Sequence, residues 1–172
     1  MLRTILLSAG ILASVPVFAA PNQIDVIGLI PDVSTSVEVE EAKKGEHGTF
    51  VIGGLQLLCS PDYIDEKLSQ FFCLLSESDW QPLSNQMAFE VLKEGFTKKL
   101  GVPTKVLSAP VSNLMGAKFQ QKLVTWRDKK GNELTITNMV SDVENGSLLL
   151  KSATKIKEDK IKIQEKAKAV KF

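Results

Sequence analysis

The stretch AKFQQKLVTWRDKKGNELTITNMVSDVENGSLLLKS, residues 117–152, decides the fold that we expect for this chain. Its three apolar segments are separated by two clusters of turn-forming residues, at 128–132 and 144–146. The second cluster ends in Asn-Gly, the strongest short signal for a β-hairpin. Leu134 and Ile136 share one face of the middle segment, because side chains two residues apart lie on the same side of a strand. The stretch therefore predicts an antiparallel β-meander.

A helix is predicted before the meander, between Ser84 and Gly101. The Ser84 hydroxyl can accept a hydrogen bond from an amide of the first turn, and Gly101 is a typical helix end. The expected apolar side consists of Met87, Phe89, Val91, Leu92, Phe96 and Leu100. A helix followed by a meander is typical of α+β proteins, in which helices pack on an antiparallel sheet.

Two further elements are expected closer to the N-terminus. Ser34 can cap a helix that runs through Lys44, ahead of the helix-ending Gly45. Residues 48–59 are rich in β-branched and other apolar side chains, and they predict a strand that bends at Gly53-Gly54.

Residues 60–75 allow two interpretations. The first is a helix, because Ile64, Leu68, Phe71 and Leu75 recur at helical spacing. The second is a hairpin centred on Glu66, which places Cys59 and Cys73 at equal distances from the turn. Opposed residues of an antiparallel pair have Cβ atoms roughly 4.5 to 5.5 Å apart, close to what a disulfide needs. The hairpin is favoured because it accounts for both cysteines.

The first 19 residues are predicted to be a secretory signal peptide. Arg3 is followed by an apolar stretch with no charge before Asp25, and small residues precede the expected cleavage after Ala19, with Ala20 as the alternative. A transmembrane helix is the competing interpretation. It needs roughly 20 apolar residues, whereas Ile5 to Ala20 gives 16, interrupted by a proline. We therefore expect export, to the periplasm or the extracellular medium of a bacterium.

An exported protein folds where thiols are oxidised, so the two cysteines are expected to form a disulfide. With His47 as the single histidine, Cys59 and Cys73 are too few for a zinc site. Their spacing also lacks the Cys-x-x-Cys pattern of redox enzymes. A structural disulfide between Cys59 and Cys73 is the prediction.

The expected organisation is a single α+β domain over residues 20–153 followed by a basic C-terminal helix or tail over 154–172. The order of elements allows two half-repeats, 24–80 and 84–153, each a helix followed by antiparallel strands. Residues 155–172 carry seven lysines against three acidic side chains, a net charge of +4, whereas residues 20–154 carry 13 basic and 17 acidic side chains, a net charge of −4. Neither value indicates binding of nucleic acid.

The tail is interpreted as a solvated helix or as a helix that docks on a partner or an anionic surface. Its apolar stripe is too thin to predict stable insertion into a membrane. Two tryptophans could line an aromatic contact site, although packing in the core or on a sheet face is the favoured use of each. The candidate partner surface is Trp80, Trp126, Lys160, Lys162 and Lys166.

No arrangement of catalytic, cofactor-binding or metal-ligating residues is predicted. A catalytic triad needs a base beside its nucleophile, and His47 is expected in an exposed loop. Asp62, Asp65 and Glu66 cluster in the predicted turn, but they lack the ordered spacing of a calcium-binding loop. We therefore expect no cofactor.

Three motifs resemble the small outer-membrane assembly lipoproteins: Gly28 to Ser34 before the first helix, Leu92 to Thr104 at the end of the second, and Trp126-Arg127-Asp128 in the meander. The secreted β-lactamase-inhibitor proteins have a similar tandem architecture. The chain departs from the lipoproteins because it lacks the lipid-anchor cysteine and has Asp32 where they usually have glycine. The resemblance implies an exported α+β interaction protein without enzymatic activity.

Together these patterns predict an exported, periplasmic binding protein that recognises an envelope or secreted protein. The alternatives are a secreted inhibitor or virulence-associated protein, and a cell-envelope hydrolase of unrecognised type.

Overall fold

The computed structural model describes residues 20–76, 78, 82–112, 116–139 and 145–169. It has a mixed α+β fold, as predicted. The helices are α1 (Ser36–Glu41), α2 (Asn85–Leu100) and α3 (Ala153–Ala169), with a short 3-10 turn at Glu46–Gly48. The strands are β1 (Phe50–Ile52), β2 (Leu55–Leu57), β3 (Cys59–Ile64), β4 (Lys67–Leu75), β5 (Lys105–Ser112), β6 (Lys118–Arg127), β7 (Glu133–Thr137) and β8 (Gly146–Lys151).

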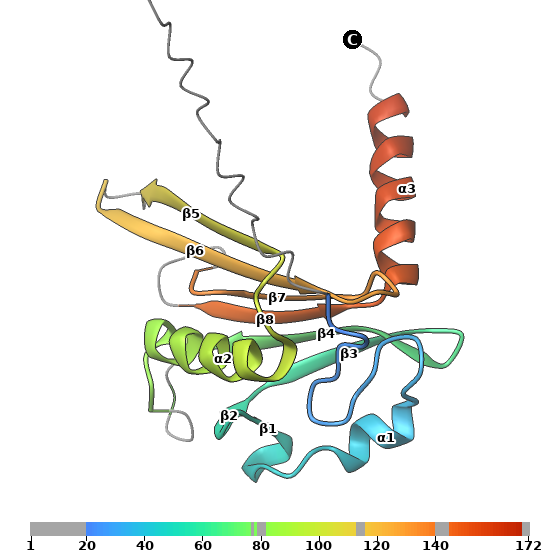
Figure 1. Cartoon of the computed structure of the whole chain (residues 1–172), viewed down its shortest axis with the longest axis horizontal. Coiled ribbons are helices and arrows are strands. Elements are labelled where there is room, and N and C mark those ends of the chain that lie inside the picture. Colours follow the sequence, from blue (N-terminus) through green and yellow to red (C-terminus); the bar gives the residue numbers. More distant parts are fainter. Residues whose placement is uncertain (1–19, 77, 79–81, 113–115, 140–144, 170–172) are drawn as a thin grey trace, which may run out of the picture.

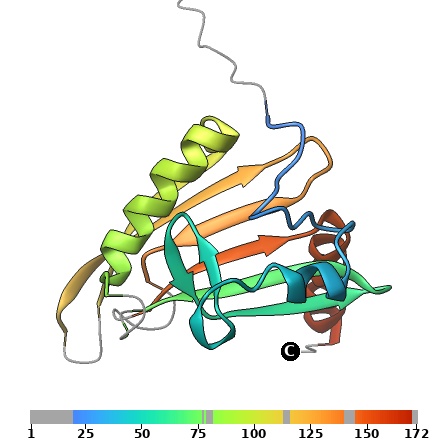
Figure 2. The same ribbon diagram turned by 90° about the horizontal axis from the view of Figure 1, so that it is seen from below.

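Six strands form one antiparallel sheet in the order β3-β4-β8-β7-β6-β5, and β1 and β2 form a separate two-stranded sheet. The predicted meander is confirmed in β6, β7 and β8. The pairing of β4 with β8 joins the strands before α2 to those after it. Figures 1 and 2 show that α1, α2 and the β1–β2 hairpin all lie on the same side of the large sheet.

The hydrophobic core lies between this covered face and the elements on it. The sheet contributes alternate residues of its central strands, which are Phe71, Cys73, Leu75, Val124, Trp126, Leu134, Ile136, Leu148 and Leu150. Helix α2 contributes Ala88, Phe89, Leu92, Phe96 and Leu100. The extended N-terminal segment adds Ile24, Val26 and Leu29, which are also buried. The core therefore depends on parts of the chain that are far apart in sequence.

Residues 59–75 form the predicted hairpin, and the helical interpretation is wrong. Asp65 and Glu66 occupy the turn with φ values of 48° and 62°, the left-handed pair that a tight hairpin turn requires. The register sets Cys59 directly opposite Cys73, with their Cα atoms 4.0 Å apart and the disulfide formed. The pairing of Cys59 with Cys73 was predicted from their equal distances from the turn, whereas the register shift between Asp62 and Tyr63 was not.

Replacing both cysteines, as Cys59→Ala with Cys73→Ala, is expected to lower the free energy of unfolding by about 3 kcal/mol, because the loop of about 15 residues is no longer closed in the unfolded chain. Urea denaturation of the variant beside the oxidised parent measures this difference. Adding a reductant to the parent should reproduce the shift, and the variant should not respond to it. Equal denaturation midpoints for variant and parent would contradict the prediction.

The first helix is shorter than predicted. Thr35, not Ser34, is its N-cap, and Thr35 and Glu38 form a reciprocal capping box that fixes the helix start. The Ser34 hydroxyl instead accepts a hydrogen bond from the Ile30 amide, 3.0 Å away, inside the preceding turn. The helix ends at Glu41 rather than Lys44.

Residues 48–59 are not one bent strand. Gly53 and Gly54 have φ values of 61° and 83°, and they form a two-residue turn that folds β1 back onto β2. Positive φ at both positions is what a tight hairpin requires, and glycine adopts it without strain. The pair therefore reverses the chain, and the resulting small hairpin covers one end of the core.

The predicted caps of α2, Ser84 and Gly101, are confirmed. Its predicted apolar side is partly wrong, because Met87 is 56% exposed and Val91 39% exposed. The buried side of α2 instead consists of Ala88, Phe89, Leu92, Phe96 and Leu100. Strand β5 was not predicted, and Gly146, which was predicted to lie in the second turn at 144–146, is the first residue of β8. Glu144 lies outside the described residues.

The two proposed half-repeats differ in detail. Helix α1 has 6 residues and α2 has 16, and β1 and β2 do not join the large sheet. The predicted C-terminal helix is present as α3, which begins at Ala153. The predicted signal peptide, residues 1–19, lies outside the described residues.

Candidate functional site

The large sheet has a second face, opposite the one that α2 covers. Side chains alternate between the two faces, so the residues between the buried positions of each strand point to this second face. The register places Leu107, Leu123 and Thr137 side by side on it, and likewise Phe72 beside Leu149. No helix of the described residues packs flat against these strands, as Figure 1 shows. We call this surface the open face.

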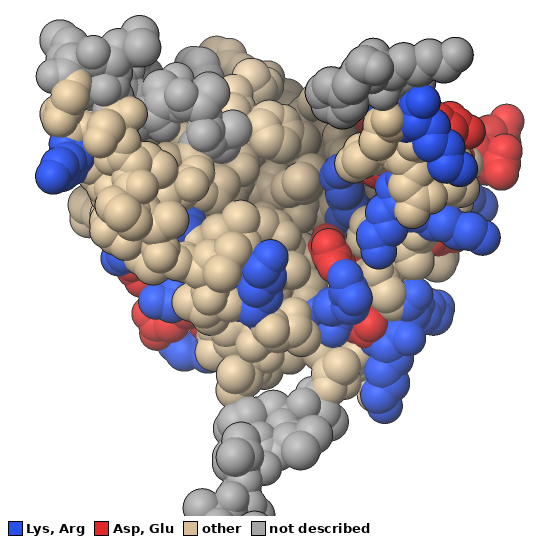
Figure 3. Space-filling model, turned by 90° about the horizontal axis from the view of Figure 1, so that it is seen from above, with Lys and Arg blue, Asp and Glu red and all other residues tan. Residues whose placement is uncertain are grey.

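The open face is apolar over the part away from α3, and its charged side chains lie toward the end where α3 begins. These are Lys105, Arg127, Glu133 and Lys151. Leu107 is 49% exposed and Leu74 37% exposed, and the smaller side chains around them are mainly threonine and serine. Figure 3 looks onto this side of the molecule and shows a broad area with few charged side chains. The residues that form it are Phe72, Leu74, Leu107, Ala109, Val111, Phe119, Leu123 and Leu149. Leu74, Leu107 and Ala109 are exposed, and the other apolar residues of this face are half-buried. Exposed apolar side chains gathered on one face mark interaction sites in soluble proteins.

Helix α3 begins at one end of the open face and extends away from the sheet on that side (Figure 1). Its start is fixed to the sheet, because the Ala153 amide donates to Asn132 Oδ1 over 2.9 Å and the Lys155 amide donates to the Ser152 hydroxyl over 3.0 Å. Lys151 Nζ lies 2.6 Å from Asp159 Oδ2 and joins the second turn to β8. The hydrogen bond from Lys151 lowers the pKa of Asp159, against a smaller opposing effect of burial.

The side of α3 that carries Asp159 faces the sheet. Residues three or four positions away share a helix face, so Ile156 and Ile163 point to the same side. Ile163 is exposed, as are all residues from 161 to 168. The outer part of α3 thus presents isoleucine and lysine side chains to solvent, and Figure 3 shows basic side chains concentrated there.

The predicted partner residues are not brought together as a group. Lys160, Lys162 and Lys166 are exposed on α3, where they border the open face. Trp126 is fully buried and belongs to the core, so its place in the partner surface is corrected. Trp80 lies outside the described residues.

The open face could not be predicted from the sequence. Leu107 lies in β5, which was not predicted, and the hairpin favoured for residues 60–75 does not indicate which face Phe72 and Leu74 occupy. Strands β4, β5, β6 and β8 carry apolar residues on both sides, so the sequence of any one of them does not indicate which side is covered. Only the register across the six strands reveals that these residues form one surface.

The charged groups next to the sheet and along α2 are engaged in local pairs. Burial tends to raise the pKa of Glu90, but hydrogen bonds from Lys93 and Lys122 outweigh it and leave this pKa lowered. The pKa of Glu94 is lowered by its hydrogen bond with Lys98. Among the described residues, no group of three or more His, Cys, Asp or Glu side chains could hold a metal ion. No described helix is long and apolar enough to cross a membrane.

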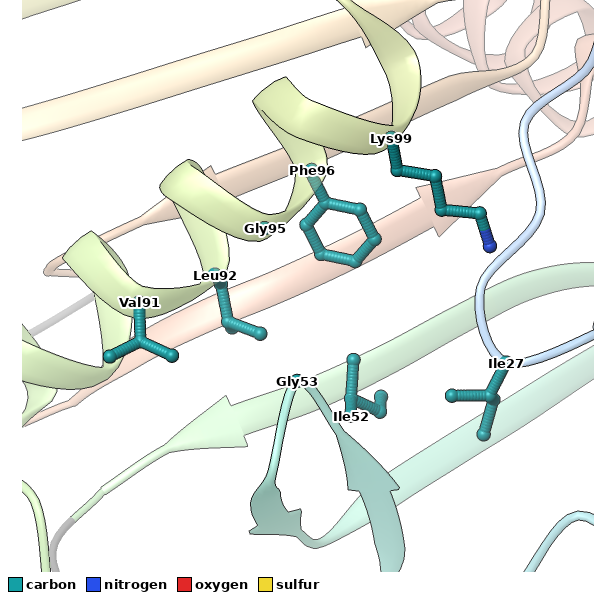
Figure 4. A pocket seen from close by; sticks show the side chains of 8 residues that line it. All are labelled: Ile27, Ile52, Gly53, Val91, Leu92, Gly95, Phe96 and Lys99. Carbon is teal, nitrogen blue, oxygen red and sulfur yellow. The ribbon is translucent and has the colours of Figure 1, made fainter.

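A pocket of about 220 Å³ lies on the other side of the molecule, between α2, the β1–β2 turn and the N-terminal segment (Figure 4). The side chains that line it are hydrocarbon except at one end, where Lys99 lies. Lys99 Nζ is 3.1 Å from Asp25 Oδ2. The lining residues are Ile27, Ile52, Gly53, Val91, Leu92, Gly95, Phe96 and Lys99.

Gly95→Ala is expected to raise the free energy of unfolding by up to about 1 kcal/mol, the difference in helix propensity between the two residues. Gly95 lies in the interior of α2, and a Cβ added there would meet nothing within 4 Å. Thermal or urea denaturation measures the gain. The matched control is Gly53→Ala, which should destabilise, because Gly53 has a φ of 61° and its Cβ would lie 3.3 Å from Leu92 Cδ2. A destabilised Gly95→Ala protein would contradict the prediction.

No family model matches the sequence, and no curated protein and no solved structure matches it either.

Proposed function

We propose that this protein is an exported binding protein that docks a partner protein on the open face, with α3 as a second wall of the site. The observation that carries the proposal is a sheet face with exposed apolar side chains, which no described helix covers and which lies beside a basic helix. Exposed apolar area of this extent is costly in a soluble protein unless it is used for contact.

The charges that border the open face indicate the chemistry of the partner. Between residues 153 and 169, α3 carries six lysines against three acidic side chains, so its net charge is +3. A complementary partner presents an apolar patch with acidic side chains along one edge, because opposite charges at the rim speed association and fix the orientation. We expect the apolar residues of the open face to supply most of the affinity for the partner.

The exported location is part of the same proposal. It is supported by the signal-like pattern of residues 1–19 and is compatible with the Cys59–Cys73 disulfide, since disulfides persist in oxidising compartments. The pattern-level resemblance to envelope assembly lipoproteins and secreted inhibitors points to the same kind of interaction protein. A secreted inhibitor would use the same surface and differ only in its partner. The hydrolase alternative would require a raised carboxyl pKa in a pocket, and in the described pocket Lys99 is the single ionisable residue.

The test places a photo-crosslinking amino acid at Leu107 on the open face or at Met87 on α2. The two side chains have similar exposure, 49% and 56%, but lie on opposite sides of the sheet. We expect a discrete protein adduct from position 107 and none from position 87 in intact cells. The same partner should bind a Leu74→Glu, Leu107→Glu variant at least about tenfold more weakly, since central apolar contacts each contribute 1 kcal/mol or more.

Two outcomes would refute the proposal. One is equal crosslinking from both positions, because the contact would then be unspecific. The other is undiminished binding by the double variant, whose substitutions at exposed positions should leave stability within roughly 0.5 kcal/mol of the parent. The mass of the N-terminus of the exported protein tests the location separately, and we expect it to begin at Ala20 or Pro21.

A further inference from the structure

The pocket beside α2 has the shape of a short trough. Val91, Gly95 and Lys99 follow one another at intervals of four residues, so they lie along one side of the helix. At 1.5 Å per residue, the trough extends for roughly 12 Å along α2. Figure 4 shows Val91 at one end, Lys99 at the other, and Leu92 and Phe96 pointing down toward Ile52 and Ile27.

The volume of the trough limits what it can hold. A closed cavity of roughly 150 Å³ lined by similar side chains stays dry and binds benzene. The trough measures about 220 Å³, below the roughly 300 to 1,000 Å³ of pockets for drug-sized ligands. It therefore accommodates one short hydrocarbon chain or one ring.

Gly95 keeps the middle of the trough open. Packing does not require a glycine there, because an added Cβ would meet nothing within 4 Å. A larger side chain at this position would extend into the space between Val91 and Lys99. The opposite wall includes Ile27, which has a φ of 52°, a left-handed conformation that is rare for a β-branched residue.

The charge at the end of the trough favours an anionic ligand. An ammonium group has three N–H donors, and the contact with Asp25 uses one direction. The neighbouring Lys98 is paired with Glu94 over 2.7 Å and does not line the trough, so Lys99 is the one cation among the lining residues. Asp25 also accepts a hydrogen bond from the Gly28 amide, which holds its carboxylate beside Lys99.

We propose that this trough binds a short-chain monocarboxylic acid, with its hydrocarbon chain along Gly95 and its carboxylate on Lys99. This ligand site is independent of the open face, since the two lie on opposite sides of the sheet. Asp25 competes with the carboxylate of the ligand for Lys99, so the affinity depends on both residues.

The experiment titrates the purified protein with hexanoate and follows its amide resonances by NMR. We expect saturable shifts concentrated at Val91–Lys99 and around Ile27. Hexylamine, which has the same chain length and the opposite charge, should cause none. Lys99→Gln should weaken hexanoate binding about tenfold, because it removes a charge-assisted hydrogen bond. Asp25→Asn should strengthen it, because the asparagine keeps an acceptor for Gly28 and removes the competing charge.

Gly95→Leu fills the trough and should abolish hexanoate binding, with thermal unfolding used to verify that the variant folds. If this variant does not fold, the opposite effects of Lys99→Gln and Asp25→Asn, both at the surface, decide the question. Hexanoate binding that survives Gly95→Leu in a folded protein, equal binding of hexylamine, or no saturable shifts at millimolar hexanoate would each overturn the proposal.

Discussion

Trp126→Ala is expected to lower the free energy of unfolding by about 4 kcal/mol, within the usual range for removing a large buried aromatic side chain. Trp126 is completely buried on the covered face of β6. Its ring centroid lies 5.9 Å from that of Phe96, so it joins the sheet to α2. The indole Nε1 donates to the carbonyl of Gly101 over 2.9 Å, which satisfies one of the unpaired carbonyls at the helix end.

Urea denaturation of the Trp126→Ala protein tests this expectation, with Trp126→Phe as the matched control. The phenylalanine keeps most of the ring contact and loses the hydrogen bond to Gly101, so it should cost much less, on the order of 1 to 2 kcal/mol. A Trp126→Ala protein as stable as the parent would contradict a major role for Trp126 in the core. A loss of this size approaches the whole free energy of unfolding of many domains. The urea series should therefore begin at low concentrations, where the variant is still folded.

Some parts of this fold could be predicted because local chemistry determined them. Ser84 and Gly101 define the ends of α2 through hydrogen bonds within a few residues. The 14-residue separation of Cys59 and Cys73, with a turn near its middle, was enough to predict that the two cysteines pair across the hairpin. In each case the deciding interaction lies within the segment itself.

Other parts depend on contacts that no single segment contains. Strand β5 is exposed at nearly every position, so it lacks the alternation of apolar and polar residues that identifies a half-buried strand. In β6, Phe119 and Leu123 lie on the open face, whereas Val124 and Trp126 are buried. Because both faces of β6 carry apolar residues, the sequence could not distinguish the core side from the open side.

The candidate sites were hidden for the same reason. The open face becomes one surface only when strands from both halves of the chain pair in the order found here. The trough beside α2 combines the helix with Ile27 and Gly53, which are distant in sequence. The basic character of α3 was readable from its lysines, but its position at the end of the open face was not.

One buried carboxylate, that of Asp128, holds the N-terminal segment against the β6–β7 turn. Asp128 is 3% exposed, and its Oδ2 accepts hydrogen bonds from the Ile24 amide at 3.0 Å and from Asn132 Nδ2 at 2.9 Å. Its Oδ1 accepts from the amides of Lys130 at 2.9 Å and Asn132 at 3.0 Å. Asn132 in turn holds the first amide of α3, at Ala153. One side chain thus links the N-terminal segment, the β6–β7 turn and the base of α3.

Asp128→Ala is therefore expected to cost about 3 kcal/mol or more, since a buried donor left without its acceptor costs 1 to 3 kcal/mol and several are affected. Urea denaturation gives the total, and hydrogen exchange locates it. The Ile24 amide should exchange faster in Asp128→Ala than in the parent, because its acceptor is gone. The control is Asp62→Ala, which removes an exposed carboxylate that accepts only from Gln70 among the described residues and should stay within roughly 0.5 kcal/mol of the parent. Unchanged protection of Ile24 in Asp128→Ala would mean that other contacts hold this segment against the sheet.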